Sequence, residues 1–461
     1  MNVFRPHSRH AAPAVLRLSL ISCAVASTMA SSAHGQAKVP PQVVKPPIAY
    51  AFIDVATAAS DMPGANMFGG AMQGGQSGGA FGAIGGLLKG AAGGATGRGN
   101  SFGNTRSFGF SSGKFVDVSV YTSKNRSIAE AVQAVPSVMN LGDLLKLIAP
   151  IPEKPLPATP PDERPIERTD YEPPKGKIML YWGCGETIRP GQPRVLDMAN
   201  ARIDDFAKIF IARGTTTKGA RSEPGHPAWP NKEDDRRVPD NASLVGQHTF
   251  TGNGIPESFK VTLGAPQDLM PPIELSQAKV AEGGVNLEWK SIPHARAYFI
   301  TAMGGKSDSR GEGGEMIFWT SSELPETGFG LMDYQSNGNI DKWLGEKVLL
   351  PASATKCAIP KGIFGSGGGR GDDAGGMLRM IAYGSEAFFA FPPRPTDPKI
   401  AWEPDWQTKV RVKSTFMSML GGMGRESRSR SGREDAPKDA PKAKEEKKPN
   451  PVDMLKGLFG R

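Results

Sequence analysis

Apolar and polar positions alternate in a series of short stretches between residues 275 and 392. Val285, Leu287 and Trp289 alternate with polar residues, which is the period-two pattern of a strand with one buried face. Further short apolar stretches are separated by Gly, Pro, Ser and Asp: 297–303, 316–320, 348–350, 355–359, 377–383 and 387–391. The last two read as a hairpin that turns at Gly384-Ser385. Because the region has no helical pattern, the sequence predicts one β-sandwich of two packed antiparallel sheets.

This region resembles a fibronectin type III domain. Leu287–Trp289, Ile292-Pro293 and Ala297-Tyr298 look like the second and third strands of that family, and Thr355–Pro360 and Ile381–Ser385 look like its fifth strand and final hairpin. The resemblance covers residues 271–394 and implies an immunoglobulin-like sandwich that serves as a spacer or binding module. A shared fold does not fix a function.

A second β-rich domain is expected at residues 175–270, directly before the sandwich. Strands are predicted at 177–182, 243–250 and 258–263, and a short helix within 199–212. The run Tyr181–Glu186 resembles a segment of exported proteobacterial envelope proteins, which implies a compartment and no activity. The fold class predicted for the chain is therefore mainly β, with two β-rich domains in series.

The N-terminal part, residues 36–149, is expected to contain a strand pair, 48–55 with 115–121, and a short helix within 127–148. A Gly-rich loop, 64–104, separates the two strands. Within it, glycines recur every fourth residue from Gly70 to Gly94, the spacing of a helix-packing surface in membranes. Each Gly weakens a helix by about 1 kcal/mol relative to Ala, so a disordered loop is favoured over a self-assembling or membrane-associated helix.

Several segments outside the two β-rich domains read as linkers or tails. A Pro-rich linker is expected at 150–174, a short amphipathic segment at 395–424 and a disordered charged linker at 425–449. The charged linker begins with basic residues that could contact an anionic envelope surface: Arg425, Arg428, Arg430 and Arg433. No aromatic residues interleave with these arginines, which argues against a nucleic-acid partner.

The last residues, 450–461, are expected to form a short helix. Asn450 and Pro451 suit a helix start, and the apolar positions are Val452, Leu455, Leu458 and Phe459. An apolar helix at the end of a flexible tether suggests a docking segment for a protein partner. The alternative is a frayed terminus, because so short a helix is marginal in isolation.

Residues 1–35 have the features of a signal peptide. Three arginines precede the apolar run Leu18–Met29, and small residues at 33–37 suit cleavage. The run is too short to span a bilayer. A less favoured reading is lipidation of Cys23, which ends a lipobox-like Leu20–Cys23. Removal of the three arginines lowers the formal charge from +9 to +6, a mild excess. We therefore expect export to the periplasm or outer envelope.

Two cysteines, Cys184 and Cys357, remain after cleavage. They are either disulfide partners, as an oxidising compartment favours, or two buried small residues. A thiol-nucleophile site of Cys184 with His226 or His248 is a distant alternative, since nothing in the sequence brings these residues together. The spacing of Cys and His predicts no metal, no cofactor and no catalytic residue. The sequence thus favours a non-enzymatic envelope protein over a self-assembling component or a Cys-dependent enzyme.

Overall fold

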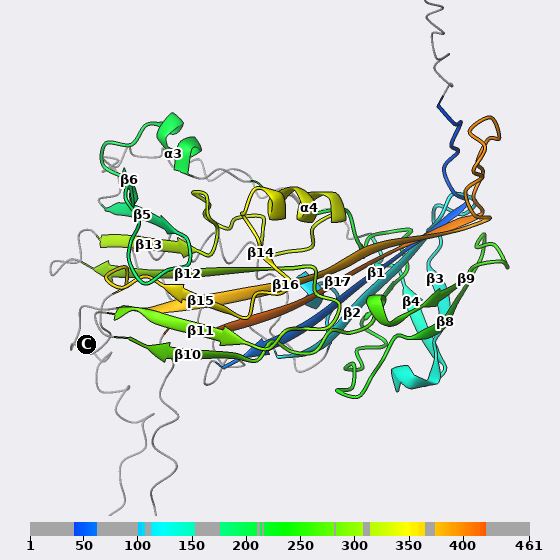
Figure 1. The fold of residues 1–461 in the computed structure, drawn as a ribbon. Coiled ribbons are helices and arrows are strands. Elements are labelled where there is room, and N and C mark those ends of the chain that lie inside the picture. The colour runs from blue at the N-terminus through cyan, green and yellow to red at the C-terminus, as the bar shows by residue number, and fades with distance from the viewer. Residues whose placement is uncertain are drawn as a thin grey trace, which may run out of the picture.

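Most strands of the chain join one large mixed sheet. A computed structural model describes residues 41–61, 100–106, 112–152, 176–209, 213, 216–280, 283–307, 314–364 and 374–420. Neighbours across the sheet follow the order β6-β5-β13-β12-β16-β17-β1-β2-β7-β4-β3-β8-β9, and β14 pairs with β12 (Figure 1). The protein is therefore mainly β, as the sequence predicts.

The strands of the large sheet vary from two to eighteen residues. In chain order they are β1 (Ala49–Ser60), β2 (Gly113–Thr122), β3 (Glu130–Ala134), β4 (Leu144–Ile148), β5 (Lys177–Trp182), β6 (Arg194–Asp197), β7 (Ala228–Trp229), β8 (Gly246–Thr251), β9 (Lys260–Leu263), β12 (Ala297–Ser307), β13 (Gly314–Thr320), β14 (Leu350–Pro351), β16 (Ala374–Phe391) and β17 (Trp406–Met419).

The centre of the sheet joins the two ends of the described chain. β1 lies parallel to β17 over its whole length and antiparallel to β2 on its other side, which is the strand pair expected near the N-terminus. β17 in turn lies antiparallel to β16. The three long strands β16, β17 and β1 therefore run side by side through the molecule.

A smaller sheet packs on one face of the large one. It consists of β10 (Leu275–Lys279), β11 (Val285–Trp289) and β15 (Lys356–Ile359) in the order β10-β11-β15. In β11 the alternating residues Val285, Leu287 and Trp289 are buried, as expected, and Trp289 meets Tyr298 of β12 edge to face at 5.7 Å. The two layers thus enclose apolar side chains between them.

The large sheet curls back on itself at its far end. Phe259, directly before β9, stacks on Trp406 at the start of β17, with ring centroids 4.8 Å apart. The Trp406 indole also donates a hydrogen bond to the Ser258 carbonyl, at 2.8 Å. Both rings are buried, so this contact closes the apolar interior at that end.

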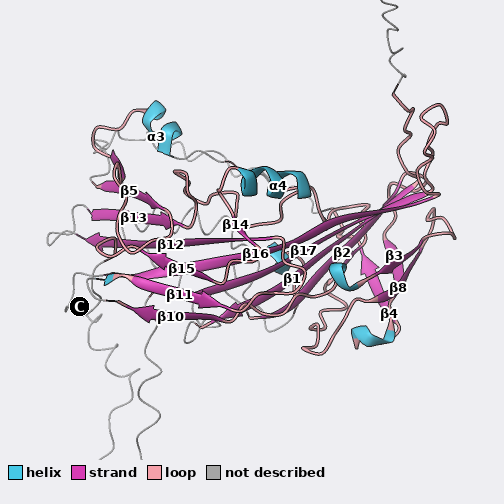
Figure 2. Cartoon of the chain, viewed as in Figure 1, coloured by secondary structure: helices cyan, strands magenta, loops and turns pink. Residues whose placement is uncertain are grey.

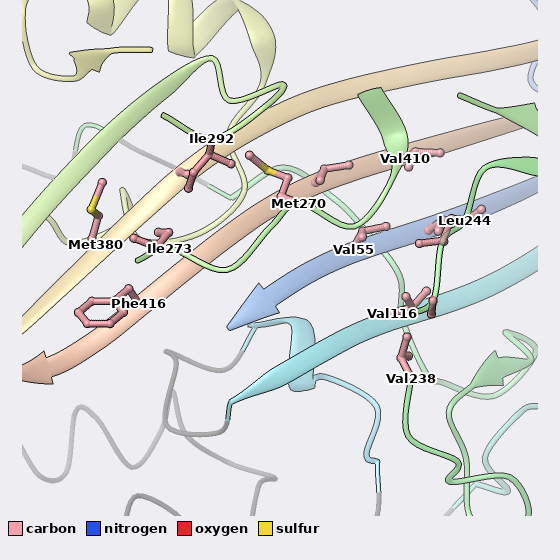
Figure 3. Close-up of a cluster of buried hydrophobic side chains, with 14 of the residues drawn as sticks. Val55, Val116, Val238, Leu244, Met270, Ile273, Ile292, Met380, Val410 and Phe416 are labelled. Atoms are coloured by element: carbon pink, nitrogen blue, oxygen red, sulfur yellow. The ribbon is translucent and has the colours of Figure 1, made fainter. Parts of the chain in front are cut away.

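One apolar core includes side chains from most strands of the large sheet and from all three strands of the small sheet. The connection between β9 and β10 crosses over β17 and β1, and Met270 and Ile273 point from it toward the sheet (Figure 3). Val55 of β1 and Val410 of β17 are among the side chains that they meet in the same cluster.

Short helices and irregular segments cover part of the opposite face (Figure 2). Helix α3 (Ile203–Ile209) lies beside β6, and helix α4 (Asn337–Gly345) packs with its buried Ile340 and Trp343 among residues of β12 and β16. Three short 3-10 turns complete the elements: η1 (Asn104–Arg106), η2 (Ser137–Met139) and η3 (Ala265–Gln267). Helix α4 corrects the expectation that residues 275–392 contain no helix.

The expected helix within 127–148 is wrong. The chain forms the antiparallel hairpin β3–β4 there. Leu145 and Leu147 are buried, whereas Leu144 and Lys146 are exposed, so the residues alternate between faces as in a strand. Tertiary burial therefore decides this segment, and Pro136, which interrupts any helix, lies in the connection.

Two further expectations are corrected around the centre of the sheet. The predicted hairpin at 377–391 is one continuous strand, β16, with an irregularity in register between Tyr383 and Glu386 where the turn was expected. The amphipathic segment 395–424 contains β17, a strand buried on both faces. Its charged residues are not solvated; they meet buried partners from other strands and loops.

The expected boundary near residue 270 does not separate two sheets. β5 lies parallel to β13, so strands from both expected domains share one ladder. The residues expected to form the signal peptide, the charged linker 425–449 and the C-terminal helix lie outside the described residues, as does Cys23. Most of the expected Gly-rich loop and Pro-rich linker lie outside them too.

Candidate functional site

A row of charged side chains crosses the four central strands on the face away from the small sheet. Neighbouring strands place Asp117 of β2 beside Asp54 of β1, Asp54 beside Arg411 of β17, and Arg411 beside Glu386 of β16. All four are buried. Because side chains alternate in a strand, the apolar neighbours of Asp54, Ile53 and Val55, point into the core on the other face.

Asp54 and Arg411 form the central ion pair of this row. Arg411 donates from Nε to Asp54 Oδ1 at 2.7 Å and from Nη2 to Oδ2 at 2.5 Å, and both side chains are 1% exposed. Burial alone would lower the pKa of Arg411, but the Asp54 charge outweighs it and the pKa is raised. The pair is bidentate, the arrangement in which a buried guanidinium is best satisfied.

A second ion pair lies two residues further along β17, where Lys413 contacts Asp333 at 2.7 Å. Both cations lie over the Tyr334 ring: its centre is 4.2 Å from the Arg411 guanidinium and 4.5 Å from the Lys413 ammonium. Burial lowers the pKa of Lys413. The pKa of Asp333 is lowered, because the Lys413 charge and hydrogen bond outweigh the effect of burial. Tyr334 donates its hydroxyl to the Val55 carbonyl at 2.9 Å, which fixes the ring.

Residues 216–221, which we call the strap, cover the row. The strap backbone binds it directly: the Ala220 N–H donates to Asp54 Oδ2 at 3.0 Å, and Arg411 Nη1 donates to the Thr217 carbonyl. The Thr217 hydroxyl donates to Glu386 at 2.9 Å. A Cβ on Gly219 would lie 1.7 Å from Arg411 Nη2, so only glycine allows the strap to lie this close.

Asp117 is the unusual member of the row, because among the described residues no cation forms an ion pair with it. It accepts hydrogen bonds from the Thr105 hydroxyl and from the Gly103 N–H, the latter at 3.1 Å. Burial, reinforced by the Asp54 charge, raises the pKa of Asp117 to about 7 against the opposing hydrogen bonds. The other carboxylates around the row are each paired with a cation: Asp54 with Arg411, Asp333 with Lys413 and Glu386 with Lys409.

Beyond the strap the same face becomes aromatic and partly open. Tyr50 and Phe52 of β1 stack at 4.5 Å, and Phe388 of β16 is 62% exposed beneath the Lys409 ammonium, 5.3 Å away. His226 stacks on Tyr121 of β2 at 5.0 Å. The charged row is therefore a covered structural network, and the open part of this face is formed by these aromatic side chains.

A cleft of about 970 Å³ opens on the other face, where the small sheet meets the ends of β1 and β2. Its apolar floor includes Ile273, Leu275, Trp289 and Phe416. Its charged lining residues are four acids and two lysines: Asp61, Asp240, Glu274, Glu288, Lys114 and Lys290. The volume is within the range of ligand pockets.

Both lysines of the cleft are occupied by local partners. Lys290 pairs with Glu274 at 2.7 Å, and Lys114 donates to the Ala242 carbonyl at 3.1 Å. The remaining acids give the lining an excess of negative charge. One wall is β10, which within the described residues pairs with β11 alone and therefore offers an edge strand.

The cysteines and the buried histidine that the sequence analysis considered as reactive groups have structural roles instead. Cys184 and Cys357 form a disulfide, with Cα atoms 5.2 Å apart, that ties the loop after β5 to β15. His248 is buried, between the Gln133 side chain at 3.0 Å and the Leu244 carbonyl at 2.8 Å, and burial lowers its pKa.

Cys184, His226 and His248 therefore do not make a thiol–imidazole site, because the Cys184 sulfur is bonded to Cys357. Within the described ranges, no group of three or more His, Cys, Asp or Glu could hold a metal ion. No helix in that part of the chain is long and apolar enough to cross a membrane. The proposed tail contacts, Arg425–Arg433 and Val452–Phe459, lie outside the described residues.

Neither the charged row nor the cleft is predicted by a local sequence pattern. Asp54 and Arg411 each lie between apolar neighbours, and that is the signal of a strand buried on both faces. Comparisons of the chain with protein-family models, with curated proteins and with solved structures found no match.

Proposed function

We propose that the protein is an exported, non-enzymatic binding module of the cell envelope and that the cleft beside β10 is its binding site. The observation that carries this proposal is the cleft itself. It has a volume of about 970 Å³, an apolar floor, an acidic lining and an adjoining edge strand. An extended segment of a partner adds to such an edge through main-chain hydrogen bonds. The acidic lining favours a segment that carries Lys or Arg.

The order of strands supports a fibronectin type III-like sandwich as the scaffold of this module. The small sheet β10-β11-β15 packs against the run β13-β12-β16-β17. In that family one sheet consists of the first, second and fifth strands, and the other of the third, fourth, sixth and seventh. We match the small sheet to the former and the run β13-β12-β16-β17 to the latter. In this interpretation the final strand is β17, and the module extends to residue 419 rather than 394.

The disulfide supports export. Such bonds persist in oxidising compartments and are rare in the cytosol. It also argues against the Cys-dependent enzyme, which requires a free thiolate at Cys184. The signal-like residues 1–35 are consistent with periplasmic or outer-envelope localisation. Fractionation of cells that express the full chain tests this part: cytosolic protein with reduced cysteines would contradict it.

A photo-crosslinking amino acid at Ser276 tests the cleft. Ser276 is exposed and lies on β10 at the cleft, whereas exposed Lys356 lies on β15, at the other edge of the same small sheet. We expect a discrete adduct from position 276 in the exported protein and none from position 356. Glu288→Lys, which reverses a charge of the lining, should abolish the adduct. Equal adducts from both positions, or none from 276, would contradict the proposal.

The C-terminal tail is proposed as a second contact with a protein partner, through Val452, Leu455, Leu458 and Phe459. It leaves the described chain after β17, whose last residues Ser418 and Met419 are bonded to Gln277 of β10. The described chain therefore ends beside β10, which forms one wall of the cleft. Deletion of residues 425–461 should weaken the Ser276 adduct if tail and cleft bind the same partner.

A further inference from the structure

Exposed apolar side chains gather at one end of the long strands. We call this end the apolar pole, formed by residues 42–45 and 391–402. Val43, Val44, Phe391 and Ile400 are 44 to 62% exposed there. In Figure 1 the pole is the blue and orange end at the upper right, away from the three-stranded sheet. Clustered exposure of this kind marks an interaction surface, whereas single exposed residues need no explanation.

The pole has a fixed shape. The segment after Phe391 returns beside residues 43–45, where the Trp402 N–H donates to the Val43 carbonyl at 2.8 Å and the Lys45 N–H to the Trp402 carbonyl at 2.9 Å. The Gln42 side chain donates to the Ile400 carbonyl at 2.8 Å. The apolar side chains are therefore presented on a hydrogen-bonded loop pair, and binding would require little ordering of the backbone.

A tryptophan and an arginine lie together among these residues. The Trp402 indole donates to the Pro392 carbonyl at 3.0 Å, and the Arg394 guanidinium lies 5.6 Å from its ring centre. Tryptophan and long basic side chains are the residues that prefer the boundary between lipid and water, since each combines an apolar body with a polar tip.

The pole carries only a small positive charge. Its two segments contain three cations and one anion, Lys45, Arg394, Lys399 and Asp397, and Glu403 follows directly after them. Lys45 and Glu403 are paired at 2.5 Å. Attraction to this surface would therefore come from apolar burial and would depend little on salt.

The pole is the part of the described chain that directly follows the expected leader in the sequence. The described chain begins at residue 41, at the pole, and the apolar run Leu18–Met29 precedes it in the sequence. The other end of the described chain lies far away, because β17 starts beside Ala49 and ends beside Ser60. Twelve residues of strand separate these levels by about 40 Å. Residues 1–35, the expected leader, therefore join the described chain at the pole and not at its other end.

We propose that the apolar pole docks on a lipid bilayer surface, with Val43, Val44, Phe391 and Ile400 in the interfacial layer and Trp402 and Arg394 at its boundary. The proposal adds a surface to the proposed envelope protein, and it does not depend on the cleft. With the pole on the membrane, the end of β17 lies at the far end of the long strands.

Flotation with phosphatidylcholine vesicles tests the proposal. The protein is a chain that starts at Ala37, which keeps every described residue and removes both the leader and Cys23. We expect it to float with vesicles at low and at high salt. The double variant Val43→Asp/Ile400→Asp should bind at least about tenfold more weakly, since about 1.4 kcal/mol of lost apolar transfer corresponds to that factor.

The matched control is Val195→Asp/Val280→Asp, which changes two side chains that are 52% and 47% exposed on or beside β6 and β10. It should bind as the native chain does, and unfolding curves of both variants should match the native curve. Brominated lipids should quench native fluorescence more than that of Trp402→Phe. The proposal is overturned by absence of flotation, by equal binding of the pole and native chains, or by binding that requires anionic lipid and disappears at high salt, which would assign the contact to the basic tail.

Discussion

Asp54 and Arg411, 357 residues apart in the sequence, form a bidentate ion pair across the parallel junction between β1 and β17. The pair lies at the centre of the sheet and is covered by the strap. It is therefore both a connection between the two ends of the chain and the attachment point of a loop.

Arg411→Met should destabilise the protein by about 3–5 kcal/mol, because it leaves the Asp54 carboxylate buried without its cation. The double variant Asp54→Leu/Arg411→Met should recover a large part of this loss, since it removes both charges. Urea unfolding measures both changes. The exposed pair Lys290–Glu274 is the control, and Lys290→Met should change stability by less than about 1 kcal/mol.

Gly219→Ala should displace the strap, because its Cβ would overlap Arg411 and Asp54. We expect a loss of about 1–3 kcal/mol and faster cleavage by trypsin at Lys218 and Arg221. Gly338→Ala in α4, where a Cβ meets nothing within 4 Å, is the matched control and should leave the cleavage rate unchanged. Equal cleavage of both variants would mean that the strap is not held by this contact.

Stability should fall as the pH rises from about 4 to about 7, because of Asp117. The pKa of Asp117 is about 7 in the folded protein and about 3.9 in an unfolded chain, so the folded state holds a proton that the unfolded state has lost. The free energy of unfolding therefore decreases between about pH 4 and pH 7, by on the order of 4 kcal/mol at most.

Asp117→Asn should remove this decrease and make the protein more stable than the native chain at pH 8. Urea unfolding at pH 5, 6, 7 and 8 measures the slope. Asp143→Asn, at an exposed position, should keep the native slope. A native slope in the Asp117→Asn variant would assign the pH dependence to another group.

Loss of the disulfide should destabilise the fold by about 2–5 kcal/mol, because it closes a loop with a sequence separation of 173. Cys184→Ser/Cys357→Ser should therefore unfold at lower urea, and dithiothreitol should shift the native chain to the same midpoint. The reductant should leave the double variant unchanged, which separates loss of the bond from a general effect of the reductant.

Local patterns in the sequence predict many of the strands, and the long-range arrangement accounts for the differences. The alternation in β11 is visible in the sequence, and so is the strand pair β1–β2. In β17, by contrast, Arg411 and Lys413 made an interior strand read as an amphipathic surface segment. Their partners, Asp54 and Asp333, are far away in the chain, and no local pattern reveals that the charges are neutralised.

Turn chemistry explains the second kind of difference. Gly384-Ser385 has the composition of a hairpin turn, yet β16 continues through it with an irregular register. A Cβ on Gly384 would lie 2.8 Å from the Val412 Cβ, so glycine serves there for close packing against β17. The cleft was not predictable in the same way, because its walls come from segments that only the completed sheet brings together.

The position of β17 has a consequence for biogenesis. It is the last described strand to be synthesised, yet it lies between β16 and β1 at the middle of the ladder. A nascent chain cannot assemble a continuous sheet before residue 419 leaves the ribosome. Until then the strands on the β16 side and those on the β1 side of the sheet remain unjoined, so the fold is completed only when its last described strand is inserted between them.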